Sequence, residues 1–413
     1  MSLFKTFTVL ALGCCCAAVQ AAPASFDLAG LERLAAQNSR VLQAARDHVD
    51  AARFAVDTAS AFPNPELEYM KGNARARAPG ANPGDVRTYG VTQPLDMPWT
   101  RQPRIDLAEA NYKLATAGAR VFEADYRTRL RLGFYEVLRR EAELRNARED
   151  AALMESVRSR IQLRVETGDA PRFELIKAEA EALNALKQSQ AASFRVEQAR
   201  AHLRQIVGDA LPQDFKLEGR LRDVPEVPAL DVLQAEVAAQ SPDLARGRAE
   251  TEMAERRLAY ERAQRLPKVA LKAGVDEDPD LRTSKVGVAV TIPLWDRRRG
   301  PIGEASAQLS RARNELAAQT FSKQQALDMA YQQYEIATAQ VSSLENGIVR
   351  SAEAALRVAE SAYRFGERGF IEVLDAQRVY RAARAELIAA RYELAAAWVE
   401  IERLRAASGE TKE

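Results

Sequence analysis

The chain has 413 residues, of which 28% are charged and only 7% aromatic, and its formal net charge at pH 7 is +1. This balance lacks the basic excess of a nucleic-acid-binding protein, so no nucleic acid is expected as a partner. The three cysteines, Cys14, Cys15 and Cys16, are adjacent in one short apolar stretch, which excludes a disulfide framework and a thiolate metal site.

Residues 1–21 are predicted to be an export signal peptide. Lys5 supplies the positive charge, an apolar core follows, and Val19-Gln20-Ala21 is a small-residue cleavage site. In the alternative interpretation, the segment ending at Cys14 is a lipoprotein signal and that cysteine is acylated. Both interpretations take the protein out of the cytoplasm. Beyond residue 22 no window holds the 18 or so apolar residues of a transmembrane helix, so any membrane insertion must use strands.

The first half of the chain, residues 22–208, predicts a helix, two strands and two long helices in that order. The helix includes LAAQNSRVLQAA from Leu34, and the strands lie in FPNPELEYMKG from Phe62 and VTQPLDMPWTRQPRI from Val91. A proline-free stretch, 105–165, is rich in Ala, Glu, Arg and Leu and predicts a helix of about 90 Å. A rod of that length does not belong to a compact globule.

The second half, residues 229–407, repeats these signals in the same order after a linker at 209–228, and a polar tail at 408–413 follows. VAAQSPDLARGR resembles the first helix segment, RLPKVALKAG the first strand, and VTIPLWDRRRGPI the second strand with the start of its helix. The second proline-free rod covers 302–365. The chain is therefore predicted to be mainly α-helical, with two tandem repeats of helix, strand, strand, long helix, turn and long helix.

The strands alternate in polarity with a period of two residues. An ordinary half-solvated sheet would show the same alternation. However, strands of this length cross a bilayer when tilted, and the long polar helices offer no conventional core. The face expected to contact lipid carries Tyr89, Val91, Val269, Leu271, Val288 and Val290, and the face expected to line water carries Glu66, Glu68, Lys268 and Lys272. Four strands cannot close a barrel alone, so several chains must pool their strands.

One segment is repeated without a gap 198 positions later (366 − 168): GDAPRFELIKAE from Gly168 and GERGFIEVLDAQ from Gly366. Both glycines suit the left-handed residue that ends a helix, and Pro171 suits the first turn of the next one. Asp169 and Glu367 lie just ahead of the returning helices. The segments are therefore predicted to be the tips of two helical hairpins.

With its halves arranged in this way, the sequence resembles the TolC-like outer-membrane factor family over nearly the whole mature chain. The resemblance rests on the tandem repeats, the strand ends QPL and IPL followed by an arginine-containing helix start, and the paired tip turns. QPLDMPWTRQPR and IPLWDRRRGPI are most similar to the heavy-metal branch, the outer-membrane components of cobalt-zinc-cadmium efflux systems.

The resemblance implies a homotrimer with one twelve-stranded barrel in the outer membrane, continued by an α-helical tunnel across the periplasm. Such proteins are passive exit ducts that work with a periplasmic adaptor and an inner-membrane RND-type transporter. The substrates implied are heavy-metal cations, and a drug-efflux or type I secretion duct is the alternative. A periplasmic coiled-coil adaptor is a rival from another class, but an adaptor usually has a single hairpin. No enzymatic activity and no cofactor are expected.

The family resemblance also implies roles for the tip residues. Arg368, Glu372 and Asp375 correspond to the arginine and two acids that line the periplasmic aperture, and Glu174 to the first-half acid that faces the arginine. The turns are expected to dock the adaptor through Gly168, Asp169, Pro171, Gly366, Glu367 and Gly369. Glu174 and Glu372 are also explained by the preference of acids for helix N-termini. The family usually has Asp where this chain has Glu372.

Other candidates have structural interpretations. His48 and His202, the only histidines, are far apart in helical stretches and are expected to be surface or packed residues, so no metal site is predicted. Arg297–Arg299 are expected at the periplasmic end of a strand, where basic residues face water and lipid headgroups. No nucleophile, acid and base assemble into a plausible active site.

Overall fold

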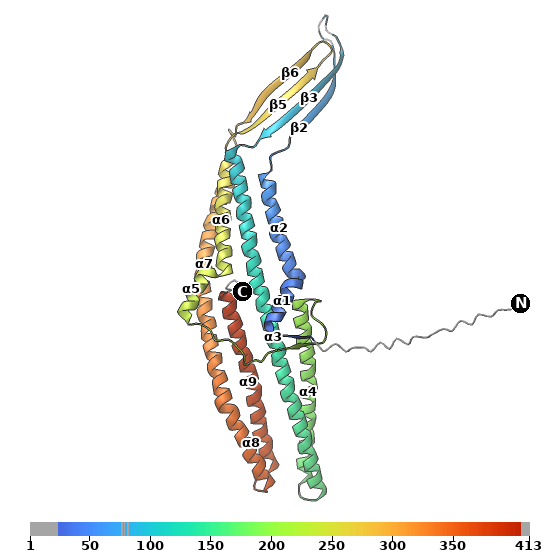
Figure 1. The fold of residues 1–413 in the computed structure, drawn as a ribbon, viewed down its shortest axis with the longest axis vertical. Helices are drawn as coiled ribbons and strands as arrows, with labels where there is room; N and C mark the ends of the chain where they lie inside the picture. The colour runs from blue at the N-terminus through green and yellow to red at the C-terminus, as the bar shows by residue number, and fades with distance from the viewer. Residues whose placement is uncertain (1–23, 76, 78, 81, 406–413) are drawn as a thin grey trace, which may run out of the picture.

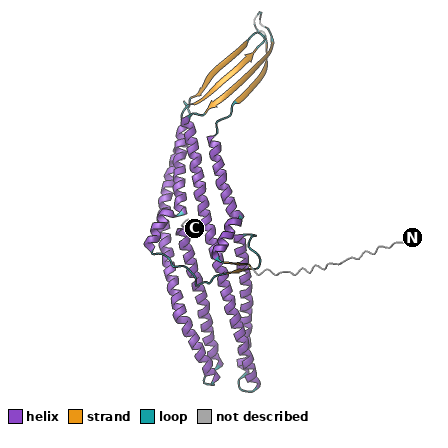
Figure 2. Ribbon diagram, viewed as in Figure 1, coloured by secondary structure: helices purple, strands orange, loops and turns teal. Residues whose placement is uncertain are grey.

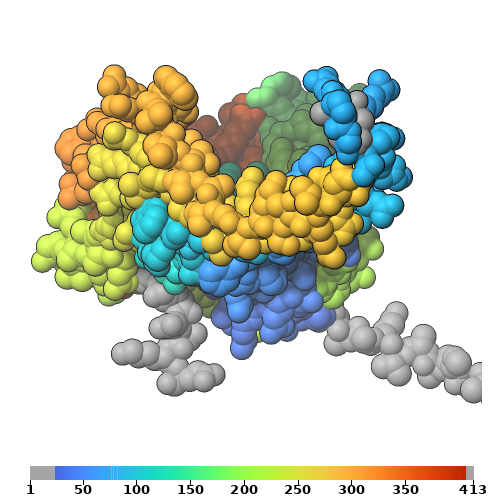
Figure 3. All heavy atoms as spheres, turned by 90° about the horizontal axis from the view of Figure 1, so that it is seen from above, coloured from blue at the N-terminus to red at the C-terminus, as the bar shows by residue number. Residues whose placement is uncertain are grey.

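A computed structural model describes residues 24–75, 77, 79–80 and 82–405. The predictions for the signal peptide, for Cys14 and for the 408–413 tail concern residues outside the described ranges. The molecule is long and narrow, with a four-stranded sheet at one end, a middle of roughly parallel helices, and two helical hairpins at the other end (Figures 1 and 2). Seen from the sheet end, the sheet is a curved band that crosses the molecule (Figure 3).

The two halves contain matching elements in the same order, except that a π-helical turn divides the first long helix of the second half in two. The first half consists of β1 (Ala24–Phe26), α1 (Leu28–Asn38), α2 (Arg40–Ser60), β2 (Glu66–Ala74), β3 (Gly84–Leu95), α3 (Pro98–Glu166) and α4 (Arg172–Val207). After β4 (Phe215–Leu217), the second half consists of α5 (Leu230–Gln240), α6 (Pro242–Ala263), β5 (Lys268–Glu277), β6 (Arg282–Thr291), α7 (Arg299–Ser343), η1 (Leu344–Ile348), α8 (Val349–Arg364) and α9 (Phe370–Arg405). The predicted mainly helical, repeated fold is confirmed, whereas the trimeric assembly stays a prediction.

The sheet has the strand order β2-β3-β5-β6, with every neighbouring pair antiparallel. Residues opposite each other in such a pair point to the same face. The register therefore places all six residues predicted to contact lipid on one face, together with Leu67, Tyr69 and Val286. The four charged residues predicted to line water lie on the opposite face. Strands β2 and β6 are the two edges, and each has one unpaired side within the chain.

The helices bury apolar residues in several separate clusters rather than in one globular core. Leu130, Phe134, Leu203, Phe215 and Trp398 belong to the largest buried cluster, at the middle of the molecule. There β1 pairs in parallel with β4, so the start of the described chain is joined to the linker between the repeats. A second cluster, which includes Met154, Ile161 and Phe370, packs the two hairpins against each other. None of the described helices combines the length and apolar character that crossing a bilayer requires.

Buried carboxylates fasten the short helices to the long ones where the sheet begins. Asp96 has a side chain only 4% exposed, and its Oδ2 lies 2.6 Å from an Nη of Arg104. The Nε of Arg104 donates to the carbonyl oxygen of Ala59 at 2.8 Å, at the end of α2. In the second half, Glu261 of α6 is 3% exposed and forms ion pairs with Arg257 and Arg298. We call these two groups the junction clamps.

The Arg297–Arg299 prediction needs a correction. These residues were expected to face water and headgroups, but Arg298 binds the buried Glu261 and has a left-handed backbone with φ 51°. Because Glu261 lies in α6, this arginine connects two helices within the chain. Arg297 and Arg299 are exposed, as are His48 in α2 and His202 in α4, which agrees with the surface interpretation of the histidines.

Candidate functional site at the hairpin tips

Both tips have the turn geometry that the glycines predict. Gly168 and Gly366 have φ values of +83° and +75°, a left-handed backbone that glycine adopts at little cost. The following residues donate back to the helix five positions earlier: the N–H of Asp169 to the carbonyl of Arg164 at 2.7 Å, and that of Glu367 to Ala362 at 2.9 Å. These bonds satisfy carbonyls that a helix end leaves unpaired.

The returning helices begin at equivalent positions. Pro171 is the residue that precedes α4, one position before the first turn in which it was predicted. Gly369 occupies the same place before α9, and the N–H groups of Glu174 and Glu372 donate to the carbonyls of Pro171 and Gly369. Both glutamates therefore lie in the first turn of a helix, where the helix dipole favours a carboxylate.

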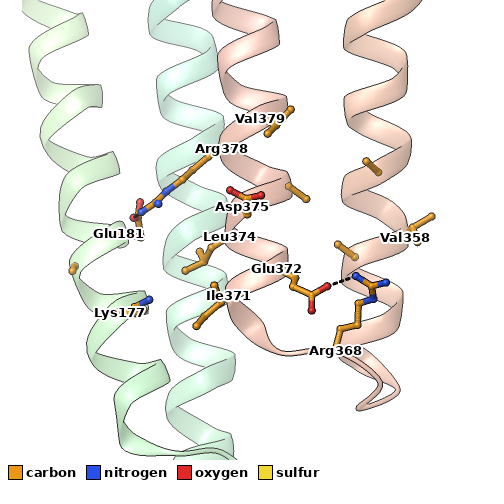
Figure 4. Close-up of a pocket in the computed structure, with 14 residues that line it drawn as sticks. Lys177, Glu181, Val358, Arg368, Ile371, Glu372, Leu374, Asp375, Arg378 and Val379 are labelled. Atoms are coloured by element: carbon orange, nitrogen blue, oxygen red, sulfur yellow. Dashed lines mark hydrogen bonds and ion pairs between the residues drawn. The ribbon is translucent and has the colours of Figure 1, made fainter.

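Three of the four predicted aperture residues share one groove. This groove has a volume of about 820 Å³ and runs between α4, α8 and α9. Its charged lining residues are Lys177, Glu181, Arg368, Glu372, Asp375 and Arg378. Figure 4 shows Arg368 paired with Glu372 at the tip, and Arg378 paired with Glu181 of the facing helix. The hydrogen bond that Arg368 donates to Glu372 raises the pKa of Arg368, whose charge is fixed at any physiological pH.

Glu174 lies apart from this group. Its Oε2 accepts a hydrogen bond of 3.2 Å from the hydroxyl of Tyr363, which lies in α8 of the second hairpin. Within one chain, Arg368 therefore pairs with Glu372 and not with Glu174. The predicted contact between Arg368 and Glu174 of a neighbouring hairpin concerns two different chains, and it stays a prediction.

Tyr363 is a site residue that the sequence reasoning missed. The guanidinium of Arg164 lies 4.9 Å from the centre of its ring, and the ring of the buried Phe370 lies 5.8 Å away. Burial, and then the nearby Glu174 carboxylate, raise the pKa of the Tyr363 hydroxyl, which keeps it protonated and able to donate. A signal was present in the repeat, because the equivalent position of the first half is Val165 (363 − 198).

Within the described residues, the tip site consists of paired charged side chains and does not have the ligand grouping of a metal centre. Among the residues that the structure describes, no three His, Cys, Asp or Glu side chains are grouped so that they could hold a metal ion. The charged side chains of the tips set a local electric field. Their exposed polar contacts also hold the two hairpins together, and these contacts break and re-form with a small change in free energy.

A strongly elongated fold, with one amphipathic four-stranded sheet and two hairpins that end in ionic tips, is found in a class of outer-membrane proteins. The outer membrane protein VceC of Vibrio cholerae has this fold: the two structures align with a TM-score of 0.77 over 92% of this chain and 95% of that one, at 17% identity.

Residues 31–209 and 233–409 each match the family model described as outer membrane efflux protein, so the chain belongs to this family. The predicted family resemblance and the outer-membrane location, extending into the periplasm, are confirmed. The chain is 28% identical to the cobalt-zinc-cadmium resistance protein CzcC of Cupriavidus metallidurans, over 85% of this chain and 83% of that protein. It is 26% identical to the nickel-cobalt-cadmium resistance protein NccC of Alcaligenes xylosoxydans xylosoxydans, over 69% of this chain and 64% of that protein.

Proposed function

We propose that this protein is the trimeric outer-membrane exit duct of a tripartite efflux system for heavy-metal cations. The observation that carries the substrate class is the likeness to CzcC, which extends through both repeats and covers 85% of the chain. The duct would work with a periplasmic adaptor and an inner-membrane RND-type transporter, and it would catalyse no reaction itself.

The edges of the sheet support the trimer. Strands β2 and β6 leave rows of backbone N–H and C=O groups unpaired in a single chain, and hydrocarbon does not tolerate such groups. Pairing β6 of one chain with β2 of the next removes every edge once the ring closes. Three chains with four strands each give twelve strands, an even number within the range of known membrane barrels.

The polar face of the sheet supports a water-filled path. Glu66 and Glu68 of β2 and Lys268 and Lys272 of β5 lie on this face, opposite the exposed apolar side chains. Mixed charges of this kind can line water, while the apolar face contacts lipid. The path continues between the helices towards the tips.

The tips support a charged aperture. Glu372 and Asp375 are three residues apart on α9 and line the same groove, so a trimer would gather six carboxylates around its periplasmic end. Carboxylate rings favour cations. The turns formed by Gly168, Asp169, Pro171, Gly366, Glu367 and Gly369 are the exposed ends on which the adaptor would dock.

The substrate class is tested by metal resistance. A strain that lacks this gene should become sensitive to cobalt, zinc, cadmium or nickel, and the intact gene should restore resistance. Sensitivity only to drugs, or failure only to secrete a polypeptide, would replace the metal substrate with one of the alternatives from the same family. Recovery of the protein in the inner-membrane or soluble periplasmic fraction would instead favour an adaptor.

The aperture is tested by single-channel recording in planar bilayers. Arg368→Ser should raise conductance by removing a contact that holds the tips closed, and Asp375→Ala should mainly reduce the preference for cations. An unchanged conductance in Arg368→Ser, together with a permanently open Asp375→Ala channel, would reverse the two roles.

A further inference from the structure

The apolar face of the sheet is built from rows of side chains that cross the strands. Nearest the helices, one row contains Leu95, Val269 and Val290, and a row further along contains Leu67, Val91, Ala273 and Val286. The next row towards the loops holds Tyr69 and Tyr89, whose ring centres lie 5.3 Å apart. The row after that differs in character and consists of Lys71, Arg87, Glu277 and Arg282. We call it the charged row.

The cations of the charged row are open to solvent. The side chains of Lys71, Arg87 and Arg282 are 55%, 47% and 72% exposed. Lys71 lies 3.0 Å from Asp85 and Arg282 lies 3.4 Å from Glu277, whereas the guanidinium of Arg87 is 3.8 Å from Asp85, beyond hydrogen-bond distance. Ion pairs this exposed contribute little free energy, so these cations exchange their partners readily for a stronger anion.

The two acids of the loop between β5 and β6 are hydrogen-bonded within the loops and not to the cations of the charged row. Asp278 accepts from the N–H groups of Asp280 and Leu281, and Asp280 accepts from the side chain of Asn82 at 2.6 Å. The loop between β2 and β3 adds two further cations, Arg75 and Arg77, both exposed. The end of the sheet away from the helices therefore offers cations to an anion that approaches from the apolar side.

The position of the charged row matches the far boundary of a hydrocarbon layer. From Leu95 to Arg87 the strand advances eight residues, which is about 27 Å along the strand and about 20 Å along the membrane normal at a tilt near 40°. Tyr69 and Tyr89 lie just inside this boundary, where aromatic girdles occur. At the opposite boundary, Trp99 and Trp295 are 44% and 94% exposed beside the junction clamps.

We infer that the charged row binds the phosphate groups of the glycolipid in the outer leaflet, lipid A. This inference rests on the proposed function, because it needs the apolar face to contact lipid. A phosphate monoester carries up to two negative charges, and an arginine fork matches its oxygens. Lys71, Arg87 and Arg282 come from three strands, so one chain presents a row of cations at the depth where lipid A holds its phosphates.

The test uses the full-length trimer in detergent with bisphosphorylated lipid A as the probe, and retained lipid is counted by native mass spectrometry. The comparison lipid has the same acyl chains and no phosphate. The wild-type protein should retain the phosphorylated lipid about 10-fold better. The triple variant Lys71→Gln, Arg87→Gln, Arg282→Gln should reduce this preference to within about two-fold.

A matched control removes three lysines from the opposite face, Lys268→Gln, Lys272→Gln and Lys285→Gln, and should keep the wild-type preference. If the control variant loses it and the charged-row variant keeps it, the inference is wrong because the faces are reversed. A preference that survives the charged-row variant but disappears with EDTA would overturn it in favour of metal bridging through Asp85 and Glu277. The mass of the same sample reports separately on the proposed function: a trimer that ignores phosphate contradicts only this inference.

Discussion

At the scale of single residues, the two hairpin tips differ at a few positions that the repeat makes equivalent. Val165 corresponds to Tyr363 and Ala170 to Arg368, so the second tip carries a hydroxyl and a cation where the first has apolar side chains. At another pair of equivalent positions, Lys177 and Asp375 have opposite charges, and both line the same groove. The differences between the halves mark the site more sharply than their shared residues do.

The first prediction concerns Tyr363. Tyr363→Phe removes the hydrogen bond to Glu174 and keeps the ring that packs against Phe370. Each chain should lose about 0.5–1.5 kcal/mol of contact between its hairpins, and the channel should open more often. Planar-bilayer recordings measure this. Tyr112→Phe, in α3 and remote from the tips, is the control, and equal open probabilities in the two variants would refute the role.

The second prediction concerns Asp150, a half-buried carboxylate of α3. Burial raises its pKa, and Arg381 and Arg384 offset this only in part. The folded state therefore binds the proton more tightly than the unfolded state, so ionisation at neutral pH costs stability. Asp150→Asn should melt at a higher temperature than the wild type at pH 7, and this advantage should vanish as the pH falls below about 4.

Glu155 is the control with the opposite sign. The hydrogen bond from Arg158 lowers the pKa of Glu155, so its contribution to stability is present at neutral pH and is lost as the pH falls. Glu155→Gln should give no advantage at pH 7. A higher melting temperature in both variants would show that lost charge in general, rather than burial of Asp150, is responsible.

The turns and the acidic residues of the tips could be predicted from the sequence, whereas the contact between the two hairpins could not. Gly168 and Gly366 were predictable because a left-handed turn restricts residue choice locally. The grouping of Glu372 with Asp375 was predictable because helix geometry fixes residues three apart. The bond between Tyr363 and Glu174 joins residues 189 positions apart, and no local rule contains that pairing.

At the scale of elements, the two junction clamps both join a short helix to a long helix at the sheet, but they place the acid and the arginine on opposite elements. In the first half the buried acid, Asp96, follows the strand, and Arg104 binds the end of α2. In the second half the acid, Glu261, lies in the short helix, and the arginine, Arg298, follows the strand. Both arrangements fix the direction in which a long helix leaves the sheet.

The third prediction tests the first clamp. Asp96→Asn leaves Arg104, which is 34% exposed, without its carboxylate, and losing a hydrogen bond to a charged group costs about 1.5–3 kcal/mol. Thermal unfolding in detergent should show a clear loss of stability. The control is Glu353→Gln, which breaks the exposed pair with Arg357 in α8 and should cost no more than about 0.5 kcal/mol. Similar losses in the two variants would exclude a special role for the clamp.

The fourth prediction tests the faces of the sheet. Val288→Arg places a charge on the apolar face and should cost roughly 2–4 kcal/mol if that face contacts lipid near the midplane. The variant should assemble poorly in the outer membrane, as measured by the amount of heat-resistant oligomer. Lys272→Ala, on the opposite face, should assemble normally. Equal assembly would mean that the assigned faces are wrong.

The strands were predictable in detail, whereas one feature of the second rod was not. Alternation in β5 and β6 fixed which residues share a face, and the register agrees. The rod from Arg299 to Arg364 is interrupted by a π-helical turn, η1, which the continuous α3 lacks. In this turn Glu345 pairs with Arg391 of α9 at 3.1 Å. The five residues of η1 include no proline, and their one glycine, Gly347, is tolerated in ordinary helices, so no local signal predicts the π-helical turn.

At the scale of the whole molecule, the fifth prediction is the oligomeric state. The two open edges of the sheet require partners in a membrane, so the purified protein should be a trimer that persists in detergent. Size-exclusion chromatography with light scattering should give three times the mass of the mature chain. A monodisperse monomer would rule out the shared barrel.

The parallel pairing of β1 with β4 also constrains the order in which the chain folds. Ala24 has Phe215 as its partner, and Phe26 has Leu217. Because the protein reaches the outer membrane by export, β1 cannot complete this pairing until the segment as far as Leu217 has also reached the periplasm. By then the whole first repeat has been made. The small parallel ladder can therefore form only after the complete first repeat is present. When it forms, it joins the two ends of that repeat.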